Sequence, residues 1–153
     1  MYDFTYHRPS SLDDAAVAIK GAGDGTFLAG GQTLLPILKL RLANPSDVVD
    51  LGDIAELKGI TVDGDTVTIG AMTPHAEVAG SADVCAKIPA LADLAESIGD
   101  LQVRNRGTIG GSIANNDPAA DYPAAVVGLG ATVHTNARTI AADDFFTGLL
   151  ETA

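Results

Sequence analysis

Two glycine pairs are the residues of this chain best suited to bind a ligand. Gly30 and Gly31 lie in the segment FLAGGQTLL, and Gly110 and Gly111 lie in TIGGSIANN. Successive backbone amides in a tight glycine turn form a concave group of donors, and no Cβ blocks the approach of a ligand. A diphosphate suits such a turn, because its concentrated charge needs several converging donors. One glycine pair is typical of an ordinary turn, but two pairs in similar surroundings favour two binding loops.

The surroundings of the two pairs indicate how each is positioned. The first pair follows a predicted short buried strand (26–31) and leads into a helical turn, whose amides add to the positive field. The second pair is flanked by the hydroxyls of Thr108 and Ser112. Glycines, asparagines and prolines between residues 108 and 123 disfavour a regular helix or strand. We therefore expect a second loop with exposed amides there.

Basic residues gather beside both pairs. Of only nine Lys and Arg residues, Lys39 and Arg41 follow the first pair, and Arg104 and Arg106 precede the second. This arrangement indicates either compensation of a bound anion or docking of a partner. The alternative is pairing with nearby aspartates, which is common on protein surfaces.

The side chains offer no good candidate for acid–base, nucleophilic or metal chemistry. His7, His75 and His134 lack the spacing of metal ligands, and each is expected to be structural or exposed. Cys85 is expected to be a small buried hydrophobe in a helix. The segment GAGDGT has Thr26 where a dinucleotide fingerprint needs glycine, so it predicts a helix end. We predict no catalytic residue and no metal site, and any chemistry would need a cofactor.

Charge and composition exclude several classes of partner. The chain of 153 residues carries 20 acidic and nine basic side chains, a net charge of -11. Such a surface repels phosphate backbones and anionic lipids, so neither nucleic acid binding nor membrane insertion is expected. There is no long apolar segment and no signal peptide pattern, and one cysteine cannot form an internal disulfide. These features predict a cytoplasmic protein with one ordinary core.

The order of predicted elements indicates an α+β fold with two lobes in one domain. Strands at 2–9, 26–31 and 45–51 and a helix at 10–23 predict a small βαβ lobe of parallel strands over about residues 1–57. A larger mixed, mainly antiparallel lobe is predicted over about residues 58–153. It would contain a hairpin at 60–69 around Asp63-Gly64, a helical segment at 73–99 in two pieces with breaks at Gly80 and Pro89, and a closing hairpin at 131–146. A short helix at 122–130 would have Asp121 as its cap and Pro123 in its first turn.

Two long segments resemble a known family. FLAGGQTLLPILKLRLANPSDVVDL (27–51) and VRNRGTIGGSIANNDPAADYPAAVVGLGATV (103–133) are similar to the FAD-binding medium subunit of molybdenum hydroxylases. The likeness is closest to the carbon monoxide dehydrogenase medium-chain type, more distant to the flavin domain of xanthine dehydrogenase, and covers essentially the whole chain. It implies the two-lobed FAD-binding fold of the p-cresol methylhydroxylase/vanillyl-alcohol oxidase type, with FAD in a cleft between the lobes.

The resemblance also implies which residues contact FAD. The backbone from Ala29 to Leu34 would wrap the pyrophosphate, Thr108 to Ser112 would contact the diphosphate and the ribityl side, and Asn115 and Asp121 would contact the ribityl chain. The implied cofactor-binding residues are Ala29, Gly30, Gly31, Gln32, Thr33, Leu34, Thr108, Ile109, Gly110, Gly111, Ser112, Asn115 and Asp121.

The implied role is electron transfer within a larger complex. A large subunit with a molybdenum cofactor would oxidise the substrate, and a small subunit with two 2Fe-2S iron–sulfur clusters would relay electrons to FAD and on to an external acceptor. A self-contained flavin reductase of the same fold and a non-catalytic assembly fragment that no longer holds FAD are the alternatives. Family members continue into a C-terminal domain of roughly 100 residues, so weaker FAD binding is expected if the chain ends at Ala153.

Overall fold

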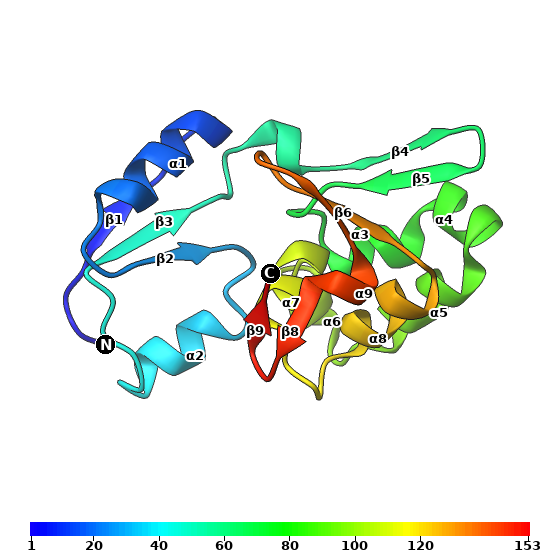
Figure 1. Cartoon of the computed structure of the whole chain (residues 1–153). Coiled ribbons are helices and arrows are strands. Elements are labelled where there is room, and N and C mark those ends of the chain that lie inside the picture. The colour runs from blue at the N-terminus through cyan, green and yellow to red at the C-terminus, as the bar shows by residue number, and fades with distance from the viewer.

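The N-terminal lobe is built on a parallel three-stranded sheet. The computed structural model describes residues 1–153, and Figure 1 shows this lobe beside a larger one that carries the rest of the chain. The sheet has the order β1 (Thr5–His7), β3 (Asp47–Asp50), β2 (Gly25–Leu28). The central position of β3 explains why Val48 and Val49 are buried while β2, at the edge, is only partly covered. The predicted parallel βαβ arrangement is confirmed.

In the sequence, one helix precedes strand β2 of this sheet and a second helix follows it. Helix α1 (Leu12–Gly21) begins at Ser11, whose hydroxyl accepts a hydrogen bond from the Asp14 amide, and it packs on β2 and β3 through Ala15. It ends before β2, so the glycines of GAGDGT terminate a helix as expected. Helix α2 (Leu34–Lys39) follows β2 after the first glycine pair. This strand–glycine–helix order is the one that the sequence predicts.

The larger lobe combines antiparallel hairpins with short helices. A 3₁₀ turn η1 (Ala55–Leu57) leads into the hairpin of β4 (Ile60–Asp63) and β5 (Thr66–Ile69), and a cluster of helices packs beside it. The remaining elements, in chain order, are α3 (His75–Gly80), α4 (Ala82–Lys87), α5 (Pro89–Ser97), α6 (Leu101–Arg104), α7 (Ile109–Asn115), α8 (Asp121–Gly128), β6 (Thr132–His134), β7 (Thr139–Ala141), α9 (Ala142–Phe145), β8 (Phe146–Gly148) and β9 (Glu151–Thr152). No helix in the chain has the length and apolar character needed to cross a membrane.

One apolar core holds the larger lobe together. Helix α3 packs on α5, α4 packs on α5, and α8 closes the same cluster. The buried members of this core are Val78, Val84, Leu91, Ala92, Ala95, Ile109 and Tyr122. The mixed α+β class with antiparallel hairpins is therefore confirmed.

Several local predictions need correction. The helical segment forms three helices, because the chain breaks at both Gly80 and Pro89. The β4–β5 pairing of Asp63 with Thr66 makes Gly64 and Asp65 the turn, one residue later than expected. Cys85 is exposed on α4, since the apolar face of that helix is occupied by Val84.

The polar segment after the second glycine pair holds the end of the chain in place. Asn116 ends α7 in the left-handed conformation, with φ 45°. Its buried side-chain amide donates to the carbonyls of Gly148 (2.8 Å) and Glu151 (2.9 Å). The β8–β9 hairpin is thereby fixed beside α7, at the position that Figure 1 shows between the two lobes.

Candidate cofactor-binding site

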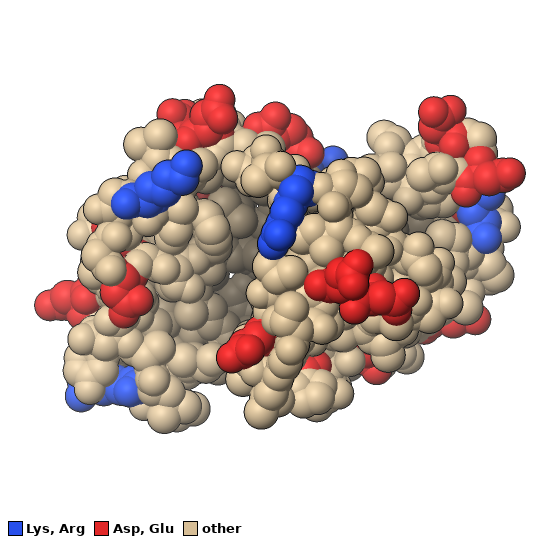
Figure 2. Space-filling model, viewed as in Figure 1, with Lys and Arg blue, Asp and Glu red and all other residues tan.

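A cleft of about 710 Å³ is formed by segments far apart in the sequence. Its walls come from the end of β2 and the start of α2, from residues 71–75, from Ile98 and Val103, and from residues 107–121. Figure 2 shows a deep hollow between the two parts of the molecule, with mostly uncharged atoms on its visible walls. A cleft of this volume accommodates a small organic cofactor.

Twelve of the thirteen predicted cofactor-binding residues line this one cleft. The exception is Ile109, which is 8% exposed and belongs to the apolar core of the larger lobe. Its position in the first turn of α7 turns the side chain inward, away from the neighbouring Gly110 and Gly111. The two glycine pairs therefore do meet at one site.

The first glycine segment presents a row of unpaired backbone donors. None of the N–H groups from Ala29 to Leu34 donates a hydrogen bond within the chain, although Gly30 and Gly31 are buried. A buried donor without a partner costs about 1–3 kcal/mol, so such groups are normally satisfied. Gly31 has φ +75°, which allows the tight turn that brings these amides together. The segment is suited to a ligand with several acceptor oxygens.

Gly30 also joins the two walls of the cleft. A Cβ at this position would collide with the carbonyl oxygen of Arg106 and would come within 2.7 Å of the Gly107 Cα. The backbone before the second glycine pair thus lies directly against the first pair. Glycine is required at residue 30 because of this contact, whatever the ligand.

The second glycine pair differs from the prediction, because it lies in the first turn of α7 instead of in a loop. Thr108 caps this helix, and its hydroxyl accepts from the Gly111 amide at 3.1 Å. The Ser112 amide donates to the Thr108 carbonyl, and the amides of Ile109 and Gly110 donate to carbonyls in residues 71–73. These four amides are already satisfied, so the expected second set of exposed donors is absent.

Tertiary contact explains why glycines are tolerated in this helix. A Cβ on Gly110 would lie 2.7 Å from the Ala71 Cα, and one on Gly111 would lie 2.9 Å from the Thr108 hydroxyl. Gly111 also faces the first segment, with Ala29 Cβ 3.4 Å from the position of an added Cβ. The pair allows close packing on both sides, which outweighs its low helix propensity.

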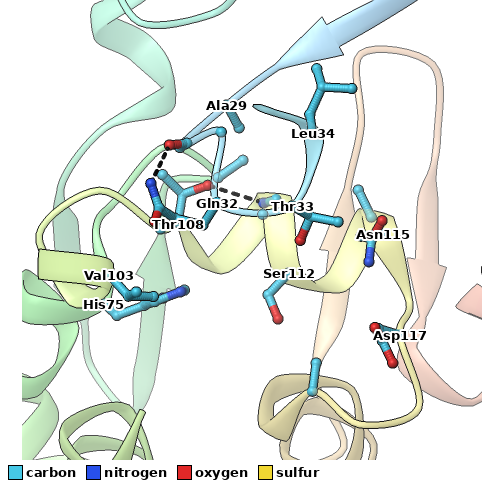
Figure 3. A pocket seen from close by; sticks show the side chains of 18 of the residues that line it. Ala29, Gln32, Thr33, Leu34, His75, Val103, Thr108, Ser112, Asn115 and Asp117 are labelled. Atoms are coloured by element: carbon cyan, nitrogen blue, oxygen red, sulfur yellow. Dashed lines mark hydrogen bonds between the residues drawn. The ribbon is translucent and has the colours of Figure 1, made fainter. Parts of the chain in front are cut away.

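Polar side chains project from both walls into the same space. Figure 3 shows Thr33 from the first segment and Ser112 and Asn115 from α7 pointing into the open cleft. Asp121 lines it from the first residue of α8, where Ala120 holds the cap position; the prediction of Asp121 as the cap is wrong. Asp117, a further lining residue outside the predicted set, lies between α7 and α8 in the chain and accepts a hydrogen bond from the Ala119 amide. These groups offer hydroxyl, amide and carboxylate contacts to a polyol chain.

His75 is the functional candidate that sequence reasoning missed. It lines the cleft yet is only 6% exposed, and its ring packs against the buried Tyr122 in a tilted arrangement, with the centroids 5.2 Å apart. Burial lowers the pKa of His75 below its ordinary value of 6.5, and the negative charge of Asp121 opposes part of that shift. The imidazole is therefore neutral at pH 7. Its only sequence signal is its place at the start of α3, because its burial depends on contacts with distant segments.

No basic side chain lines the cleft. This bears on the role of the four Lys and Arg residues that flank the glycine pairs in the sequence. None of Lys39, Arg41, Arg104 and Arg106 lines the cleft, and none forms an ion pair. Arg104 donates to the Ile98 carbonyl, and Arg41 lies over the Tyr2 ring. Pairing with aspartates is therefore wrong. Arg106 lines a neighbouring hollow that shares Ala29 and Gly30 with the cleft, so compensation of a bound anion stays a prediction. Within the cleft itself, an anion would be held by backbone dipoles.

The chemistry available in the cleft is recognition. It offers a row of amide donors, several polar side chains and an aliphatic end near Ile98 and Val103. No cluster of three or more His, Cys, Asp or Glu side chains that could hold a metal ion occurs in the chain. The arrangement suits an extended ligand with a charged diphosphate, a polyol and a flat ring.

Comparison with known proteins identifies the ligand class. A family model described as the FAD binding domain in molybdopterin dehydrogenase matches residues 2–153. The chain is 45% identical over 150 residues to the carbon monoxide dehydrogenase medium chain of Hydrogenophaga pseudoflava, covering 95% of this chain and 52% of that protein.

Solved structures agree with this likeness. The carbon monoxide dehydrogenase of Hydrogenophaga pseudoflava that lacks the Mo-pyranopterin moiety matches with a TM-score of 0.93 and 45% identity over 97% of this chain and 54% of that one. Quinoline 2-oxidoreductase of Pseudomonas putida 86 matches with a TM-score of 0.94 and 36% identity, covering 98% and 54%. The chain therefore spans about half the length of the proteins it is similar to.

Proposed function

Because the chain belongs to the family of FAD binding domains in molybdopterin dehydrogenases, we propose that its cleft binds FAD with the diphosphate against Ala29–Leu34. The observation that carries this assignment is the row of unpaired amides in that segment. They supply the donors that two phosphate groups need in a cleft that no Lys or Arg side chain lines.

The rest of the cleft fits the other parts of FAD. Thr33, Ser112, Asn115 and Asp121 face the space beside the amide row and suit the hydroxyls of the ribityl chain and the ribose. Gly110 and Gly111 allow α7 to pack closely against Ala71 and Ala29. This packing keeps α7 near enough for Ser112 to reach the ligand. Thr108 contributes indirectly, since its hydroxyl holds the first turn of that helix.

The role of the bound cofactor is electron transfer. FAD accepts and releases one or two electrons, and the protein positions it and sets its environment. We propose that electrons arrive from the iron–sulfur clusters of a small subunit, after oxidation of the substrate at a molybdenum cofactor in a large subunit, and leave to an external acceptor. The family description and the medium-chain relatives support this proposal. Copurification of molybdenum and iron–sulfur subunits with a tagged form of the chain tests the partners.

Titration of the cofactor-free chain with FAD, followed by flavin fluorescence, tests the binding site. Gly31→Ala places a side chain at φ +75° beside Leu35, and we expect it to weaken FAD binding about tenfold or more. Gly64→Ala is the matched control, because Gly64 also has a positive φ, +56°, but lies in the β4–β5 turn with open space around it. FAD affinity in that variant should stay within about twofold of the unaltered chain.

The outcomes separate the alternatives. Equal FAD affinity in Gly31→Ala and the unaltered chain would show that the amide row is an ordinary turn. No FAD binding by the unaltered chain would favour an assembly fragment that does not hold the cofactor.

A further inference from the structure

His75 occupies an unusual position for a histidine that only supports the fold. Its amide donates to the Gly107 carbonyl at 3.0 Å, which fixes the start of α3 against the segment before α7. The ring then passes over Gly107, where an added Cβ would lie 2.5 Å from Nε2. Figure 3 shows the imidazole beside Val103, with its tip turned towards the open cleft. Residue 107 must be glycine for the imidazole to reach this place.

The two ring nitrogens have different surroundings. Nδ1 is buried and has no hydrogen-bond partner, while Nε2 lies at the cleft side and also has no partner within the chain. A neutral imidazole carries its hydrogen on one nitrogen only. A hydrogen on Nδ1 would leave a buried donor unpaired, so we assign the hydrogen to Nε2, which leaves it available to a ligand.

The groups around Nε2 define what kind of ligand atom it meets. Ile98 and Val103 line this end of the cleft with aliphatic surface, and Asp121, which also lines the cleft, lies near enough to affect the pKa of His75. A flat heteroaromatic ring fits such a surface, and its ring nitrogen or carbonyl oxygen provides the acceptor. The phosphates and hydroxyls have other partners, in the amide row and the polar residues of α7.

We propose that His75 is a binding residue for FAD, donating a hydrogen bond from Nε2 to an acceptor atom of one of its two ring systems. The proposal rests on the proposed function, because it takes FAD as the ligand of the cleft. It explains why a buried imidazole with an unpartnered Nδ1 is kept here: a fully apolar residue would fill the space without an unpaired polar atom, but it could not hold the ligand.

Two substitutions distinguish this role from a structural one. His75→Leu removes both nitrogens and fills a similar volume, and His75→Gln keeps an N–H donor on a side chain of similar reach. For His75→Leu we expect FAD affinity to fall about tenfold, the range of one lost hydrogen bond, while its thermal unfolding temperature stays equal to or above that of the unaltered chain. His75→Gln should recover most of the affinity.

The same titration with ADP shows which ring meets His75. Weakening of both FAD and ADP in His75→Leu assigns Nε2 to the adenine, and weakening of FAD alone assigns it to the isoalloxazine. Equal FAD affinity in His75→Leu and the unaltered chain overturns the proposal, as does a loss of affinity that only follows a loss of folded protein in circular dichroism. If the unaltered chain binds no FAD, the proposed function fails, and this inference fails with it.

Discussion

Gly30 and Gly107 lie in direct backbone contact where the two walls of the cleft meet, and an added Cβ on Gly30 would come within 2.7 Å of the Gly107 Cα. The two residues are 77 positions apart in the sequence. Their contact fixes the distance between the amide row of residues 29–34 and helix α7. The geometry of the whole cleft therefore depends on one position where only a hydrogen atom fits.

Gly30→Ala should disturb both folding and ligand binding. The added methyl group meets backbone atoms of Arg106 and Gly107, which cannot move as a side chain can. Overpacking of this kind costs about 1–3 kcal/mol in the free energy of unfolding, and we expect FAD affinity to fall as the walls separate. Urea denaturation and FAD titration measure the two effects.

Gly21→Ala is the control for this substitution. Gly21 is the last residue of α1 and has no heavy atom within 4 Å of an added Cβ. Its replacement should leave FAD affinity unchanged and stability equal or slightly higher, because alanine favours the helix. Equal stability of Gly30→Ala and Gly21→Ala would contradict the importance of the contact.

Thr108→Val should lower stability by removing the cap of α7. The hydroxyl of Thr108 accepts from the Gly111 amide at 3.1 Å, and the side chain is buried. Valine has nearly the same shape, so the change isolates the lost hydrogen bond, which is worth about 1 kcal/mol at a helix N-cap. Thr108→Ser keeps the hydroxyl and should stay closer to the unaltered chain in urea denaturation. The reverse order would show that the methyl group matters more than the cap.

The fold was predictable from sequence where short-range pattern decides the structure. The first glycine segment follows a β-strand and precedes a helix, and its turn needs a positive φ at Gly31; all of this depends on neighbouring residues. The same holds for the β4–β5 hairpin and for the serine cap of α1. Twelve predicted site residues line one cleft because two such motifs meet there.

Long-range contacts decide the features that sequence reasoning missed. The sequence predicts a loop at Gly110 and Gly111, but the segment is helical, and Ala71 packs against Gly110 and accepts a hydrogen bond from its amide. Ile109 lies between cleft residues in the sequence, yet the helix turns it into the core. The burial of His75 arises from Tyr122 on α8, 47 residues later. Neither the spacing of these residues in the sequence nor their types predicts these contacts.

Asn116 should be more sensitive to alanine than to glycine. Its backbone has φ 45°, and its side chain donates two hydrogen bonds to the β8–β9 hairpin. Asn116→Gly keeps the left-handed conformation and loses only the bonds, at a cost of about 1–3 kcal/mol in stability. Asn116→Ala adds about 1 kcal/mol of backbone strain. Urea denaturation gives the order, and limited proteolysis should cut the C-terminal residues faster in both variants; an alanine variant more stable than the glycine variant would contradict the assignment.

His75 should make the stability of the chain depend on pH between about 5.5 and 7.5. In the unfolded chain its pKa is the ordinary 6.5, and in the folded chain burial against Tyr122 lowers it while Asp121 on α8 opposes the shift. Below pH 6.5 the unfolded chain therefore binds more protons than the folded one, and the free energy of unfolding falls as the pH falls, by at most about 1.4 kcal/mol per pH unit.

Above about pH 7.5 the residue is neutral in both states and contributes no pH dependence. The quantity to measure is the difference in the free energy of unfolding between the unaltered chain and His75→Leu, in which the contributions of the other titratable groups cancel. We expect the unaltered chain to lose stability relative to His75→Leu as the pH is lowered from 7.5 to 5.5. A difference that stays constant over this range would mean that His75 gains a proton as readily in the folded chain as in the unfolded one, and the neutral imidazole assigned to the cleft would be wrong.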